Sequence, residues 1–314
     1  MSTLHKERRK ESNGITSVAY WGFMRNTFLA ILPLFTCVLY FGNPVERPFS
    51  LEWEHIQKPH IERETIPTKL LCIYAFFSVF LFMIFYSFSS GHPGRTFVCT
   101  WVAFATGIAI NEAITATLKT SISRFRPDFL DRCKPDMEQA QLIIDGQMKE
   151  YGHQIAASFI CTGSSKAIRE GRHSFPSGHA SLSSWSAFFS LILLVARLYQ
   201  YLNRDTIGHH LNPTLSDISS TSHEGNKESS TGSTAPLYTA PHTISLRELL
   251  LVFVFCVVAF VPLLGSVIIS VSRVANNWHH PSDVFVGWII GAISGLISGG
   301  VSIVLEDDED LKTR

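Results

Sequence analysis

Three polar clusters in the sequence contain residue types that bind and transfer phosphate. In the first, Lys119 and Arg126 lie seven residues apart, about two turns of a helix. If a helix continues through both residues, the two cations share one face, an arrangement suited to a dianionic phosphate. The pattern is weak alone, because basic residues beside an apolar segment commonly anchor it at a membrane surface.

The second cluster, residues 174–179, precedes an apolar run and ends in Pro-Ser-Gly-His. A Ser177–Gly178 turn leading into a helix offers backbone N–H groups and the positive end of the helix dipole, which bind anions. His179 would lie at the rim, with a pKa suited to proton transfer. Ser177 is also a common N-cap residue, so an ordinary helix cap is the alternative.

The third cluster, residues 272–283, adds a third cation, Arg273. His279 and Asp283 are four residues apart, so on a helix the carboxylate can reach one ring nitrogen and make the other a better nucleophile. A metal site at His279, His280 and Asp283 is the competing interpretation. Further carboxylates are missing nearby and no HExxH-type pattern is present, so we expect no metal.

The elements that position these clusters are membrane-spanning helices. A helix needs about 20 mostly apolar residues to cross the hydrocarbon core. Six stretches meet or approach this length, at residues 27–42, 70–88, 97–118, 180–202, 249–270 and 284–305. We therefore predict an all-α, polytopic bundle of six transmembrane helices, with the three clusters at helix ends.

Composition agrees with a membrane protein. The chain is 46% hydrophobic and 17% charged, against about 25% charged residues in soluble domains. The net charge is zero, so nothing in the charge balance indicates a nucleic-acid partner.

Charge distribution gives a topology and a division into segments. The basic tail, residues 1–26, stays cytosolic by the positive-inside rule, and six spans return the acidic tail, residues 306–314, to the same side. The membrane domain covers residues 27–305, and all three clusters fall on its non-cytosolic side. Residues 203–245 are rich in Ser, Thr and Gly and are predicted to form a disordered cytosolic loop. This loop is either a phosphorylation target or an insertion without a role.

Three further features have two interpretations each. Cys133 and Cys161 share a polar loop, and form a disulfide if it faces an oxidising compartment or remain free thiols. Asn111 and Glu112 lie inside a span, where they form interhelical hydrogen bonds or mark a transport pathway. Glycines recur at every fourth residue of the last span, where small residues allow either close packing inside the bundle or dimerisation. They are Gly287, Gly291, Gly295 and Gly299.

Taken together, the clusters resemble a known family. Lys-x6-Arg-Pro at 119–127, Pro-Ser-Gly-His at 176–179 and Ser-Arg-x5-His-x3-Asp at 272–283 match the tripartite signature of the type 2 phosphatidic acid phosphatase superfamily. The run at 126–133 resembles the lipid phosphate phosphatase branch, and within it the fungal diacylglycerol pyrophosphate phosphatases.

The resemblance implies a role for each site residue. His279 would attack phosphorus and form a phosphohistidine, Asp283 would orient His279, and His179 would protonate the leaving alkoxide and then activate water. The phosphate oxygens would be bound by Lys119, Arg126, Arg273, Ser177 and the Gly178 amide. With three cations in place of Mg²⁺, we expect activity without a metal or other cofactor.

The implied substrates are lipid phosphates: phosphatidate, diacylglycerol pyrophosphate, lysophosphatidate and sphingoid-base phosphates. Their acyl chains would stay in the bilayer of the endoplasmic reticulum, Golgi, vacuole or plasma membrane. Two rival functions are a catalytically silent lipid-binding or scaffolding relative, which is expected to lack a motif residue, and a channel or transporter. The sequence does not determine the oligomeric state.

Overall fold

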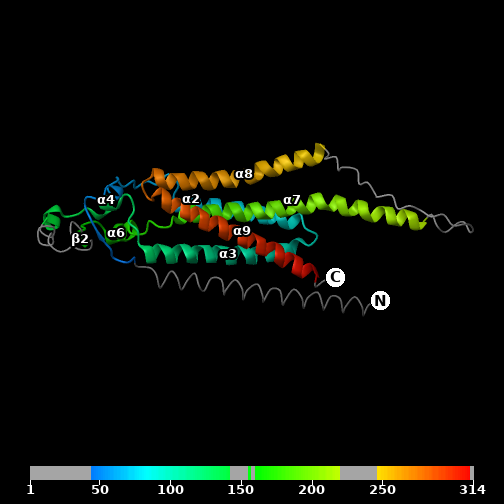
Figure 1. Cartoon of the computed structure of the whole chain (residues 1–314), viewed down its shortest axis with the longest axis horizontal. Coiled ribbons are helices and arrows are strands. Elements are labelled where there is room, and N and C mark those ends of the chain that lie inside the picture. Colours follow the sequence, from blue (N-terminus) through cyan, green and yellow to red (C-terminus); the bar gives the residue numbers. More distant parts are fainter. Residues whose placement is uncertain (1–43, 142–154, 157–159, 220–245, 312–314) are drawn as a thin grey trace, which may run out of the picture.

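The computed structural model describes residues 44–141, 155–156, 160–219 and 246–311 (Figure 1). Its long helices are α2 (Thr68–Phe88), α3 (Pro93–Ile122), α7 (Gly178–Ser219), α8 (Leu246–Ala275) and α9 (Pro281–Leu311). Its short elements are β1 (Pro48–Phe49), η1 (Glu54–Ile56), α4 (Phe129–Cys133), β2 (Ile155–Ala156) and α6 (Ser165–Gly171).

The long helices confirm the predicted all-α membrane architecture. All five contain segments long and apolar enough to cross a membrane, and they match five of the six predicted spans. The first predicted span, residues 27–42, and the tail before it lie outside the described residues. In the described part, strand structure is limited to an antiparallel pair of two-residue strands, β1 and β2. The chain is thus an integral membrane protein.

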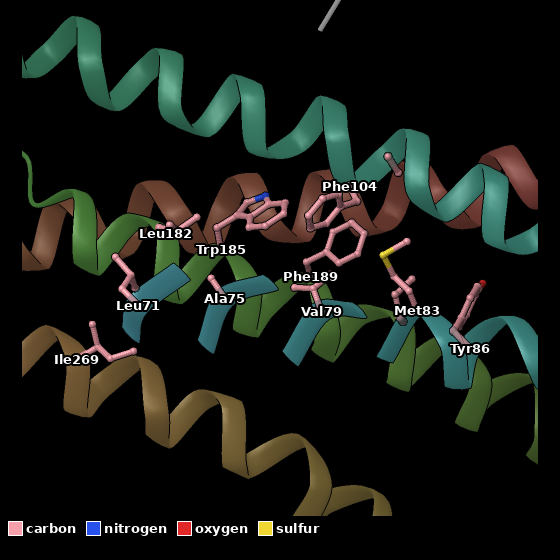
Figure 2. Close-up of a cluster of buried hydrophobic side chains, with 12 residues drawn as sticks. Leu71, Ala75, Val79, Met83, Tyr86, Phe104, Leu182, Trp185, Phe189 and Ile269 are labelled. Carbon is pink, nitrogen blue, oxygen red and sulfur yellow. The ribbon is translucent and has the colours of Figure 1, made fainter. Parts of the chain in front are cut away.

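The bundle core forms between α2, α3 and α7 (Figure 2). Residues on α2 repeat every fourth position and so form one apolar stripe; they are Leu71, Ala75, Val79 and Met83. On α7, the rings of Trp185 and Phe189 stack with centroids 5.5 Å apart, and Phe104 of α3 lies 5.4 Å from Trp185. These rings fix α7 laterally, and with it the residues at its N-terminus.

The glycine stripe of α9 packs against α7. A Cβ atom added at Gly287 would lie 2.5 Å from the carbonyl oxygen of Ser177, so the two backbones are in direct contact. Gly291 and Gly295 meet the α7 backbone in the same way, at the carbonyl oxygens of Ser181 and Trp185, and Gly299 packs against the side chain of Ile192. Packing inside the bundle is therefore confirmed as the reason for this stripe.

One end of the bundle carries a compact layer that we call the cap, residues 44–67, 124–141, 155–156 and 160–177. It contains α4, α6 and the β1–β2 pair, at the left of Figure 1. Its apolar core includes Phe49, Phe125 and Phe129. Of the two alternatives for Cys133 and Cys161, the structure has the disulfide, which ties α4 to the segment before α6.

Two helices extend beyond their predicted boundaries. Residues 203–219, predicted as part of a disordered loop, continue α7, because adding a residue to a formed helix costs far less than starting one. The remainder of that loop, 220–245, lies outside the described residues. The C-terminal tail was predicted to begin at residue 306. Instead α9 continues to Leu311, and Glu306 is buried against Arg197.

The polar residues inside α3 join helices. The Asn111 side-chain oxygen accepts hydrogen bonds from Ser181 of α7 at 2.8 Å and from Ser294 of α9 at 2.9 Å. Its amide nitrogen lies 3.4 Å from the carboxylate of Glu112. The prediction of interhelical hydrogen bonds is therefore confirmed for Asn111.

Candidate active site

The three predicted clusters meet where the cap joins the bundle. Each site residue lies at or near the end of a long helix that points toward the cap. Lys119 lies in the last turn of α3 and Arg273 in the last turn of α8. Gly178 and His179 begin α7, and Asp283 lies in the first turn of α9. His279 lies between α8 and α9. Helices far apart in sequence therefore supply one site.

Arg126 reaches this site by a route that the sequence did not predict. The helix expected to carry it together with Lys119 ends at Ile122, because Ser123 has a left-handed backbone conformation with φ 45°. Arg126 lies instead in the irregular segment between α3 and α4, and its backbone N–H donates to the carbonyl of Gly171 at 2.8 Å. The prediction that the two cations share one helical face is thus wrong, although both cations lie at the candidate site.

The guanidinium of Arg126 is held against an aromatic ring. It lies 4.7 Å from the centroid of Trp278, whose ring is also 4.8 Å from the Arg132 guanidinium. Burial and the nearby Arg132 lower the pKa of Arg126 to about 10. Arg126 therefore remains a cation at neutral pH, fixed by a cation–π contact.

Several buried donors at this point have no partner among the described residues. They are Nε and Nη1 of Arg126 and Oγ of Ser177, and Nε2 of His179 is likewise buried without a hydrogen bond. Lys119 is near them, because a Cβ atom added at Gly178 would lie 3.8 Å from its Nζ. Buried polar atoms are normally hydrogen-bonded, so this concentration of unpaired donors and positive charge fits an anion with several acceptor oxygens, such as phosphate.

The Ser177 backbone, rather than its side chain, begins α7. Its carbonyl accepts from Ser181 N at 3.0 Å, and its N–H donates to the carbonyl of Asp283 at 3.0 Å. Since Oγ makes no hydrogen bond among the described residues, the alternative of an ordinary side-chain cap is wrong. The hydroxyl is available for a ligand.

His279 has the form that a nucleophile requires. Its Nδ1 lies 2.6 Å from the backbone carbonyl of Ser174. A carbonyl can only accept, so Nδ1 carries the proton and Nε2 keeps its lone pair. Burial, followed by the charges of Arg126 and Lys119, lowers the pKa of His279 well below its ordinary value. The ring is therefore neutral at physiological pH.

Asp283 acts on His279 indirectly. The predicted contact between them is absent, because α9 begins at Pro281 and His279 lies before the helix. Its carboxylate instead accepts from Ser174 Oγ at 2.5 Å, from His280 N at 3.0 Å and from a third residue, Arg124, at 2.7 Å. Asp283 thus holds Ser174, whose carbonyl holds the His279 ring.

Arg273 is fully buried and largely paired within the protein. Its Nη1 donates to Glu64 Oε2 at 2.8 Å, and its Nη2 donates to the Ile66 carbonyl at 2.7 Å. The same Glu64 oxygen lies 3.7 Å from Nε2 of His179. A carboxylate from the segment before α2 therefore joins two of the predicted site residues.

Sequence reasoning missed four residues of this site. Ser174, Arg124 and Trp278 lie inside the three clusters, where they could have been considered. Glu64 lies 55 residues before the first cluster in a segment with many charges, and no local pattern distinguishes it.

The two adjacent histidines are oriented by the backbone. His280 Nε2 lies 3.1 Å from the Phe125 carbonyl. In a similar way, His279 Nδ1 lies beside the Ser174 carbonyl. Within the described residues, no group of three or more His, Cys, Asp or Glu side chains is arranged to hold a metal ion.

Comparisons with known proteins address the family. The PAP2 superfamily model matches residues 100–299, which include all three clusters. Phospholipid phosphatase 1 of Rattus norvegicus is 28% identical over 268 residues, covering 81% of this chain and 74% of the rat protein. Lipid phosphate phosphatase 2 of Arabidopsis thaliana is 28% identical over 184 residues, covering 59% of this chain and 44% of the plant protein.

No solved structure matches the chain. The particular resemblance to fungal diacylglycerol pyrophosphate phosphatases stays a prediction. The family match extends over more than half of the chain and contains every residue predicted for the site. The chain therefore belongs to the PAP2 superfamily.

Proposed function

We propose that this protein is a lipid phosphate phosphatase that works through a phosphohistidine intermediate on His279. One observation carries the proposal: a neutral, buried histidine lies among unpaired, buried donors and cations at the end of a membrane bundle. The names of the rat and plant relatives support a phosphorylated lipid as the substrate.

The first step transfers the phosphoryl group to the enzyme. Nε2 of His279 attacks phosphorus with its lone pair, the P–O bond to the lipid breaks, and His179 gives a proton to the leaving oxygen. Lys119 and Arg126 stabilise the charge on the equatorial oxygens, together with Arg273, Ser177 Oγ and the Gly178 amide. Phosphoryl transfer depends mainly on such positioning and charge stabilisation.

The second step releases phosphate. His179, now neutral, takes a proton from water as the water oxygen attacks phosphorus, and the P–N bond to His279 breaks. The Ser174 carbonyl keeps Nδ1 of His279 oriented in both steps, because it accepts that N–H throughout. The cationic groups replace the charge that Mg²⁺ supplies elsewhere, so we propose that no metal is needed.

The location of the site supports an amphiphilic substrate. The residues lie at helix ends, where a lipid could leave its acyl chains in the bilayer and extend its headgroup to the cations. We propose phosphatidate, diacylglycerol pyrophosphate, lysophosphatidate and sphingoid-base phosphates as substrates. The Cys133–Cys161 disulfide in the cap favours a non-cytosolic site, because disulfides persist in oxidising compartments.

The rival functions are less well supported. A catalytically silent relative is expected to lack a motif residue, and all of them are present here. The polar Asn111 of the third predicted span is used in interhelical hydrogen bonds rather than left free for a transport pathway.

The decisive test is phosphate release from phosphatidate and diacylglycerol pyrophosphate in detergent micelles containing EDTA. We expect release by the wild type and a loss of roughly a thousandfold or more in His279→Ala, because the nucleophile is gone. The matched control is His280→Gln, which changes a ring beside the Phe125 carbonyl and should retain activity within about tenfold of the wild type. Equal release by wild type and His279→Ala would exclude the phosphohistidine mechanism.

A further inference from the structure

A segment before α2, residues 58–66, lies along the turn that carries the nucleophile. We call this segment the strap. It precedes the region matched by the family model, residues 100–299. Five hydrogen bonds join it to residues 273–278. One is the bond from Arg273 Nη1 to Glu64. The other four are Asn277 Nδ2 to the Pro59 carbonyl at 3.2 Å, Trp278 Nε1 to the Ile61 carbonyl at 3.1 Å, Thr65 Oγ1 to Asn276 Oδ1 at 2.9 Å, and Arg273 Nη2 to the Ile66 carbonyl at 2.7 Å.

Glu64 is the strap residue whose carboxylate reaches the site. Its Oε2 accepts from Arg273 Nη1 at 2.8 Å and lies 3.7 Å from His179 Nε2. Its side chain is 17% exposed, whereas that of Arg273 is fully buried. A single anion therefore lies between a group that would bind phosphate and the group that would transfer the proton.

The pairing of Arg273 leaves room for phosphate. A guanidinium has five N–H donors. Nε and Nη2 bond to Ser272 Oγ and the Ile66 carbonyl, and one hydrogen of Nη1 bonds to Glu64. Among the described residues nothing bonds the second Nη1 hydrogen, so Arg273 can contact a phosphate oxygen while Glu64 keeps its place.

We propose that Glu64 is a positioning residue of this active site. Its carboxylate fixes the Arg273 guanidinium and the His179 ring relative to each other, and the strap fixes Glu64. This inference rests on the proposed phosphatase function. It assigns part of the catalytic geometry to a segment outside the three motifs.

The test compares Glu64→Gln with the wild type by steady-state kinetics on phosphatidate and by inhibition with orthophosphate. Glutamine keeps the shape and an acceptor oxygen but removes the charge. We expect kcat to fall by about tenfold or more, because Arg273 loses the ion pair that orients it and His179 loses the carboxylate beside its ring. We expect the inhibition constant of orthophosphate to stay the same or decrease, because an anion site has lost a negative charge.

Two control variants separate positioning from loosening of the strap. Glu62→Gln changes an exposed carboxylate in the strap, and Thr65→Val removes the hydrogen bond to Asn276. Both should keep kcat within about threefold of the wild type. The inference is overturned if Glu64→Gln lowers kcat less than tenfold, if it weakens orthophosphate inhibition in parallel, or if Thr65→Val loses as much kcat. A wild type that releases no phosphate would refute the proposed function itself, and this inference with it.

Discussion

His173 and His279 are kept neutral by burial and by neighbouring cations. For His173, burial, followed by the charges of Lys119, Arg126 and Arg169, lowers the pKa from 6.5 to about 4. The unfolded chain binds a proton at this residue as the pH falls through 6.5, whereas the folded chain does so only near pH 4. The folded state therefore loses stability between these two values as the pH decreases.

This linkage predicts the behaviour of His173→Gln. Between pH 7 and pH 5 the wild type should lose about 1 kcal/mol more stability than the variant, after allowance for the partial exposure of the ring. The measurement is the thermal unfolding temperature in detergent at both pH values. His92→Gln, a change of an exposed histidine at the start of α3, should behave like the wild type. A variant as acid-sensitive as the wild type would contradict the prediction.

Residue types and spacing predicted which residues come together better than they predicted the contacts between them. All eight predicted residues lie where the cap joins the bundle, because each belongs to a cluster at a helix end. The way in which Asp283 acts could not be predicted, since its partner Ser174 is 109 residues away in sequence. Glu64 was missed for the same reason, because its bond to Arg273 spans 209 residues.

At the scale of elements, the contact between α7 and α9 sets the position of the anion site. Gly287 touches the backbone of Ser177, the residue that precedes α7. Gly287→Ala would force the two helix ends apart, which costs about 1–3 kcal/mol of stability. Because a displacement of about 1 Å can reduce catalysis by a hundredfold, we expect kcat to fall by roughly tenfold to a hundredfold.

The measurement is phosphate release together with thermal unfolding, and α9 offers a matched control. Gly300 lies on the same helix, and a Cβ atom added there meets nothing within 4 Å. Gly300→Ala should therefore leave both quantities close to those of the wild type. Normal kcat in Gly287→Ala would show that this contact does not position the site.

Helix centres were predictable from apolar composition, but helix ends were not. The five described spans lie where hydropathy placed them, because a membrane requires long apolar helices. The ends depend on tertiary contacts instead. Ser123 ends α3 four residues after Lys119, and the bonds of Glu306 carry α9 past its predicted boundary.

At the scale of the whole molecule, the bundle has two polar networks at opposite ends. Beyond the core, away from the cap, Glu306 of α9 accepts from Arg197 of α7 at 3.0 Å, from Tyr86 of α2 at 2.6 Å and from Thr96 of α3 at 2.9 Å. Arg197 also lies 3.9 Å from the Tyr86 ring centroid. One carboxylate thus joins four helices at the end without the proposed active site.

Because the two networks lie at opposite ends, a change in the Glu306 network should lower the stability of the protein without lowering its kcat. In Glu306→Gln, the buried Arg197 loses its counter-ion, so the protein should be destabilised by about 3 kcal/mol in thermal unfolding in detergent. At temperatures where the variant stays folded, its kcat should equal that of the wild type, because the apolar core lies between the network and the cap. Adding Arg197→Gln should recover part of the stability, since neither charge is then left unpaired. A folded Glu306→Gln variant with reduced kcat would mean instead that the two ends are coupled through the helices that they share.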